Sequence, residues 1–180
     1  MPLPPDLPLD NPLWHWATHL WQRPGIEAPC LSLQAEGWSV TRLLTALWLA
    51  QAGQAWDGTE SNDVVHWRER ATGMIRQLRQ SLPKQAPATA ALRQGLSRCE
   101  LMAEQLELAL VWLHWPQSQP DRPDFAHTPR GQVWDNLLAA APHQHTPGQK
   151  EQEALQSLCN CLYNEQMLIQ PRTAPGDASC

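Results

Sequence analysis

Apolar residues along this chain recur with the spacing of helix faces. The clearest segment follows Ser39 and has the i, i+3, i+4, i+7, i+8 pattern of an amphipathic helix. Its apolar members are Val40, Leu43, Leu44, Leu47 and Trp48. No alternating β-branched run of strand length is found. The pattern predicts an all-α protein, a single-domain helical bundle of about five to seven helices.

Two longer segments, residues 61–82 and 88–115, carry apolar residues at alternating steps of three and four. In the first segment these are Val64, Trp67, Ala71, Met74, Leu78 and Leu82. In the second they are Leu92, Leu96, Cys99, Ala103, Leu106, Leu110 and Leu113. Such regularity predicts two helices packed side by side through these faces. Because the connection near 84–87 is short, we expect them to be antiparallel.

Proline and glycine mark the ends of the other elements. Asn11-Pro12 is typical of an N-cap followed by proline at the first helical position, and Pro24-Gly25 would end that helix. Thr128-Pro129 and Thr146-Pro147 would open two later helices. The chain then divides into an extended Pro-rich tail (1–10), a helical domain (11–170) containing a Pro-rich linker (116–127), and a mobile tail (171–180).

Composition narrows the functional classes. The formal net charge of −5 argues against DNA binding through a basic surface. The first residues lack the features of a signal peptide, and the longest apolar stretch, 43–50, is too short for a membrane span. Five cysteines with irregular spacing indicate reduced thiols, with Cys30 and Cys99 as small core residues. We therefore expect a cytoplasmic protein.

The candidate metal ligands have unsuitable spacing. His15 and His19 share a helix face, but Trp16 stands where a zincin has its glutamate, and no third ligand is near. Cys159-x-Cys161 and His143-x-His145 have one-residue spacings that fit zinc poorly. Catalytic motifs such as Gly-x-Ser-x-Gly or a phosphate-binding glycine loop are missing. We therefore expect no metal, no cofactor and no catalytic site.

Two groups of residues are candidates for binding. Arg68, Arg76 and Arg79 could contact an acidic partner, a phosphate or RNA; the alternative is a solvated face paired with the glutamates of 100–107. The chain also has ten tryptophans, which are enriched at binding hot spots. Among these we single out Trp14, Trp21 and Trp48.

Several motifs, in order, resemble an uncharacterised proteobacterial family, domain of unknown function 2390. They are Leu13-Trp14-His15-Trp16-Ala17 with Leu20 to Ile26; Leu31-Ser32-Leu33-Gln34 with Val40 to Ala50; Trp67-Arg68 with Ile75-Arg76 and Arg79; and Cys99 to Glu107. Together they cover about residues 13–115. The resemblance implies a small helical bacterial protein and supplies no activity, and the part after 116 departs from it.

These observations favour a non-enzymatic protein that acts through protein–protein interaction. An alternative is a helical domain that binds a small apolar or acidic molecule between helices. An unrecognised enzyme is the third hypothesis. A contiguous exposed apolar patch would favour the first, a pocket with a few convergent polar groups the second, and a cluster of buried acids with shifted pKa values the third.

Overall fold

The computed structural model describes residues 3–114, 130–143 and 145–169, and side-chain surroundings as far as residue 162. Every regular element in these ranges is helical, which confirms the all-α prediction. The elements are α1 (Pro12–Trp21), α2 (Glu27–Ala35), α3 (Val40–Gln51), α4 (Asn62–Trp67), the π-helix η1 (Arg68–Thr72), α5 (Gly73–Ser81), α6 (Pro87–Leu113), α7 (Arg130–Ala139) and α8 (Gln149–Ile169).

Short polar side chains start the helices where the sequence predicts. The Asn11 side chain accepts a hydrogen bond from the backbone N–H of Trp14 at 2.9 Å, directly before Pro12. Ser39 and Ser61 cap α3 and α4 in the same way. Gly37 and Gly53 follow α2 and α3 with φ of 96° and 71°, a backbone conformation that favours glycine.

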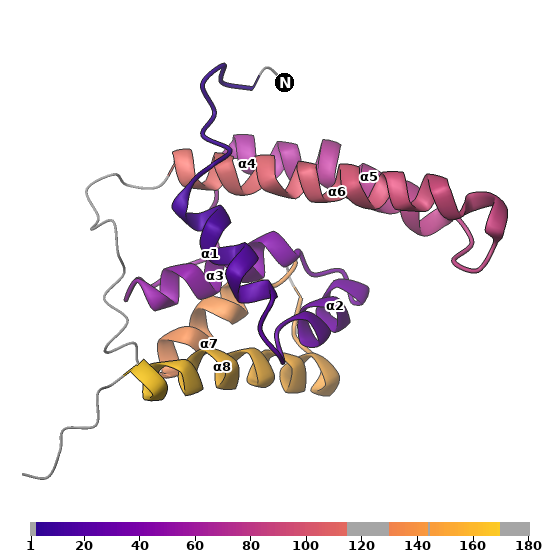
Figure 1. Ribbon diagram of the computed structural model, residues 1–180. Helices are drawn as coiled ribbons and strands as arrows, with labels where there is room; N and C mark the ends of the chain where they lie inside the picture. Colours follow the sequence, from indigo (N-terminus) through magenta and orange to yellow (C-terminus); the bar gives the residue numbers. More distant parts are fainter. Residues whose placement is uncertain (1–2, 115–129, 144, 170–180) are drawn as a thin grey trace, which may run out of the picture.

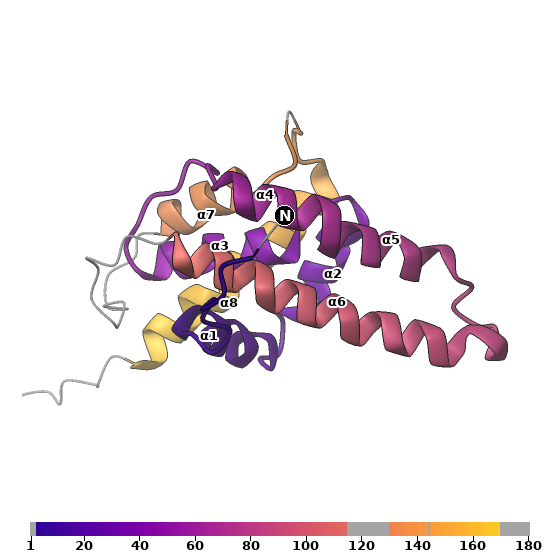
Figure 2. The same ribbon diagram turned by 90° about the horizontal axis from the view of Figure 1, so that it is seen from above.

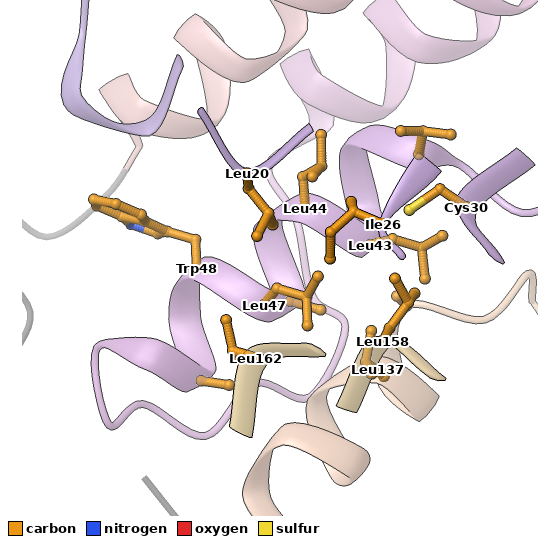
Figure 3. Packing of buried hydrophobic residues seen from close by; sticks show 14 of the residues in the cluster. Leu20, Ile26, Cys30, Leu43, Leu44, Leu47, Trp48, Leu137, Leu158 and Leu162 are labelled. Atoms are coloured by element: carbon orange, nitrogen blue, oxygen red, sulfur yellow. The ribbon is translucent and has the colours of Figure 1, made fainter. Parts of the chain in front are cut away.

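The core lies around α3, of whose 12 residues 11 are buried. Helix α3 packs against α1, α2, α6 and α7, and α8 packs against α2 and α7. In Figure 3, Leu43 and Leu47 of α3 point toward Leu137 of α7 and Leu158 of α8. Burial of such leucines stabilises the fold by about 1.5–3 kcal/mol for each side chain.

The helices α4, η1, α5 and α6 form an antiparallel pair that extends well past the rest of the molecule (Figures 1 and 2). Residues 62–81 run out along one helix, and α6 returns beside them. The predicted long antiparallel pair is therefore present. Its first helix is interrupted by η1, where the backbone hydrogen bonds reach one residue further than in an α-helix.

The predicted packing of this pair is wrong at its outer end. Met74, Leu78 and Leu92, predicted to pack between the two helices, are 61%, 53% and 54% exposed. Cys99, expected in the core, is also exposed, whereas Cys30 is buried. Charged side chains occupy the seam between the helices instead, because arginines on α5 meet glutamates on α6.

Two predicted segments, the Pro-rich linker 116–127 and the mobile tail 171–180, lie outside the described residues. Residues 3–10 of the predicted N-terminal tail carry no helix. Over the described part of the chain, no helix combines the length and the apolar character needed to cross a membrane.

Candidate interaction surface of the helical arm

The outer part of the helix pair, residues 73–102, is here called the arm. On α5, Met74 and Leu78 are four residues apart and share one exposed stripe. On α6, Leu92, Cys99 and Met102 stand at steps of seven and three, which also place them on one face. We call these two stripes together the arm face. Large apolar side chains so exposed on a projecting element are typical of an interaction surface.

The seam of the arm is held by ion pairs. The Arg76 guanidinium donates to Glu100 and to Glu104, both at 2.7 Å, and Arg79 donates to Glu100. The side chains of Arg76, Glu100 and Glu104 are only 14%, 8% and 18% exposed. Solvent screening is therefore weak, and each pair contributes more than an exposed pair would.

A second group of charges lies where the arm joins the body. Arg68 binds Glu60 through two nitrogens, both at 2.6 Å, and Glu107 through Nε at 2.7 Å. Arg42 also pairs with Glu60 and donates to the backbone carbonyl of Ala139. Two arginines and two glutamates thus join α3, the loop before α4, η1, α6 and α7 in one network.

The π-helix positions two side chains of this network. Arg68 is its first residue and Thr72 its last, and both hydrogen-bond the fully buried Glu107. Thr41 of α3 donates to the same carboxylate. The extra residue in this turn changes the rotation of α5 relative to α4, which allows Arg76 and Arg79 to continue the row of charges along the seam.

The two seam glutamates have pKa values shifted in opposite directions. Burial alone would raise the pKa of Glu100, but hydrogen bonds from Arg79 and Arg76 hold it below its ordinary value. Burial raises the pKa of Glu104 to about 7; Arg76 opposes this rise, and the neighbouring charges of Glu100 and Glu107 add to it. Glu104 is the seam carboxylate whose negative charge is least compensated.

The three arginines singled out from sequence are therefore all ion-paired with glutamates. Three of their partners, Glu100, Glu104 and Glu107, belong to the row that the alternative interpretation named. The row is buried in the seam and is not a solvated face. A role of Arg68, Arg76 and Arg79 in binding stays a prediction.

Two of the predicted tryptophans line a groove between α1, α2, α3 and α6. Trp14 and Trp21 of α1 form one wall, and the cavity has a volume of about 560 Å³. Its opposite wall is the face of α6 that carries Ser97, Leu101, Glu104 and Leu108, at steps of four, three and four. Helix α6 therefore presents the seam, the groove wall and the outer stripe, and Glu100 and Glu104 lie at the boundary between the seam and the groove.

Trp48 lies elsewhere and is buried at 6% exposure. Its ring packs edge-on against Trp16 and Trp112, with centroids 5.3 and 6.4 Å away. Its indole N–H is a buried donor without an acceptor among the described residues. By contrast, the N–H groups of Trp16 and Trp38 reach Gln51 and Glu151, both at 2.6 Å.

The histidines and cysteines weighed as metal ligands lie in different surroundings. His15 lies at the surface and contacts Asp10, while His145 contacts Glu151 at 2.6 Å. Cys159 is buried and Cys161 half-buried. Within the described ranges, no three histidine, cysteine or acidic residues are arranged to hold one ion.

Sequence reasoning missed Arg42 and Glu60, which complete the buried network. A signal for Arg42 existed, since it is the one charged residue in the otherwise apolar and neutral segment 40–51. Its position at the core boundary requires a partner. Glu60 stands in a loop without periodicity, and no sequence signal connects it with Arg42 or Arg68.

Charge is distributed unevenly between the arm and the rest of the chain. Residues 73–102 contain five arginines and lysines but one glutamate, whereas the whole chain has 13 basic and 18 acidic residues. The arm is therefore net +4, and the remainder, with 8 basic and 17 acidic residues, is net −9. Arg98 is exposed and stands four residues before Met102, so one positive charge borders the arm face.

These features define a class: an all-helical protein with a basic, apolar-faced arm and a separate groove beside it. The chain belongs to a family described as protein of unknown function (DUF2390), whose pattern matches residues 12–111. The matched part includes the arm, the buried network and the groove walls on α1, α2, α3 and α6. No curated protein and no solved structure matches this chain.

Proposed function

We propose that this protein acts by protein–protein interaction, and that the arm face binds an acidic amphipathic helix of its partner. One observation carries the proposal: the arm keeps its ion pairs in the seam and exposes its methionines and leucines. Met74, Leu78, Leu92 and Met102 are each more than half exposed. Flexible methionine and leucine side chains on a helical surface suit the apolar side of another helix.

Charge favours an acidic partner over a second copy of this chain. Two arms of net +4 would repel each other, whereas an acidic helix would be attracted to the arm. The spacing of the outer stripe on α6, with steps of seven and three, matches the contacts of helices that pack at a shallow angle. We place this interaction in the cytoplasm, as the number and spacing of the cysteines suggest.

Site-specific photo-crosslinking in the cell that naturally makes the protein tests the proposal. A photoreactive benzoylphenylalanine at Met102 should crosslink one protein, through a peptide rich in Asp and Glu with helical apolar spacing. The same group at Gln152, exposed on α8, should not label that protein. Attachment to RNA, to lipid, to a second copy or to a basic peptide would refute the proposal, as would no adduct.

A matched pair of variants distinguishes the contribution of the arm face to binding from that of the rest of the arm. Leu92→Gln combined with Met102→Gln should abolish the crosslink from a probe at Leu78 and leave the unfolding midpoint within error. Gln94→Ala is exposed on the same helix but off the stripe, and it should retain the crosslink. Equal loss in both variants would show that the face is not the determinant.

A further inference from the structure

The groove beside the arm supports an inference that does not depend on the interaction proposed for the arm face. Its volume of about 560 Å³ lies within the range of small-molecule sites, about 300–1,000 Å³. Trp14, Trp21, Leu31 and Leu44 supply an apolar wall. None of the groove residues contributed by α1, α2 and α3 is charged, so all its charges come from the arm side.

One carboxylate oxygen on that side accepts no hydrogen bond from the described part of the chain. Glu104 Oε1 accepts from Arg76 at 2.7 Å, whereas no described residue donates a hydrogen bond to Oε2. Glu100 differs, because Arg76 and Arg79 together occupy both of its oxygens. Glu104 lines the groove, and its side chain is 18% exposed. A donor in the groove is therefore able to reach an open acceptor.

The surrounding charges decide whether a cationic or an anionic polar group (the head) of a ligand suits this acceptor. Glu104 stands between Glu100 and Glu107 on α6, and it forms an ion pair with Arg76 of α5. Arg79 also lines the groove but is bound through Nε and one terminal nitrogen to Glu100. A positively charged head would offset the under-compensated carboxylate of Glu104, whereas an anionic head would lie beside Glu104 and Glu100, the two glutamates that line the groove.

We propose that the groove binds a small apolar molecule bearing one protonated amine, with the amine at Glu104 Oε2 and the apolar body against Trp14, Trp21 and Leu44. The amine forms a charge-assisted hydrogen bond in a poorly solvated position, and the indole rings cover the hydrocarbon. Neutral and acidic molecules of the same shape pack against the apolar wall but leave the negative charge of Glu104 uncompensated. The site thus selects by charge at one end and by apolar surface at the other.

Isothermal titration calorimetry with three eight-carbon probes tests this site: n-octylamine, n-octanol and octanoate. At pH 8, octylamine should bind about tenfold more tightly than octanol, as expected for a hydrogen bond to a charged group, and octanoate should bind most weakly. Glu104→Gln should remove the preference for the amine and leave octanol binding unchanged. Trp21→Ala should weaken binding of both octylamine and octanol.

The control is Glu153→Gln, which removes an exposed carboxylate on α8 and should change none of the three affinities. At pH 6 the preference for the amine should shrink in the wild type, because Glu104 then takes up a proton. Octanoate binding as tightly as octylamine, a preference that survives Glu104→Gln, or no binding of any probe at millimolar concentration would overturn the proposal.

Discussion

Glu107 is completely buried, and the side chains around it compensate its charge. Arg68 supplies the opposite charge, and the hydroxyl groups of Thr41 and Thr72 donate two further hydrogen bonds. These donors come from α3 and from both ends of the π-helix. A single carboxylate therefore joins the body of the protein to the base of the arm, and its cost of burial is offset only while all three donors are in place.

Replacing this carboxylate should be strongly destabilising. In Glu107→Gln, Arg68 loses one of its two carboxylate partners. The amide NH₂ group that replaces one carboxylate oxygen is itself a donor, and it faces the donors that Glu107 had accepted from. We expect a loss of about 3–5 kcal/mol in the free energy of unfolding, measured by urea denaturation. Glu153→Gln, on the surface of α8, should stay within about 0.5 kcal/mol. An equally small effect at Glu107 would contradict the buried network.

Glu104 gives an unusual dependence of stability on pH. Its pKa in the folded protein is about 7, above the ordinary value of 4.5, so the folded state binds more protons between these pH values. Its contribution to stability is fully present below pH 4.5 and is lost as pH rises through 7. The free energy of unfolding should therefore fall by about 1–3 kcal/mol over this window because of Glu104.

The comparison that isolates this effect is Glu104→Gln, which keeps the hydrogen bond to Arg76 but does not titrate. Relative to wild type, the variant should gain stability steadily from pH 5 to pH 8. Urea unfolding at several pH values measures the difference. Parallel curves for the two proteins would show that Glu104 has an ordinary pKa.

Among the elements, the π-helix determines how the seam is built. It adds a residue between α4 and α5, so Arg68 and Thr72 reach Glu107 while Arg76 and Arg79 reach Glu100. A continuous α-helix would advance by 100° for each residue and would turn one of these groups away from α6.

Deleting Ala71 should remove the π turn and break the row of ion pairs. We expect a loss of about 3–5 kcal/mol in unfolding free energy, because at least one buried charge is left without its partner. Deleting Gln85, in the exposed turn between α5 and α6, should cost less than about 1 kcal/mol. Differential scanning calorimetry of both deletions checks this, and similar melting temperatures would contradict a structural role for the π-helix.

The ends and types of the helices could be predicted from the sequence because their signals are local. Asn11 and Ser39 lie next to the helices they cap, and the apolar residues of α3 repeat within that one segment. The packing of the arm could not be predicted in this way. Arg76 and Arg79 are three residues apart, Met74 and Leu78 are four apart, and either spacing suits one face of a helix. Only the glutamates on the distant α6 decide which face lies inside.

The candidate site was partly predictable for the same reason. Trp14 and Trp21 could be recognised as binding candidates, and both line the groove. That they share it with Glu104 depends on how α1 packs against α6, which no local pattern records. The partnership of Arg42 with Glu60 likewise depends on the course of a loop.

For the molecule as a whole, the distinctive feature is a basic arm that projects from an acidic body (Figures 1 and 2). The seam and the network give the arm rigidity without using its leucines and methionines. These side chains remain available to another molecule, and the groove on the neighbouring face of α6 remains separate from them. The proposed interaction depends on this placement of charges inside and apolar residues outside.

Methyl NMR of the purified protein with a soluble nitroxide measures that placement directly. In protein labelled at methionine and leucine methyl groups, the nitroxide should strongly broaden the signals of Met74, Leu78, Leu92 and Met102. The signal of Leu110, 1% exposed on the same helix α6, should be protected. Protection of the four arm methyl groups to the same degree as Leu110 would contradict the account, since it would place them inside the seam.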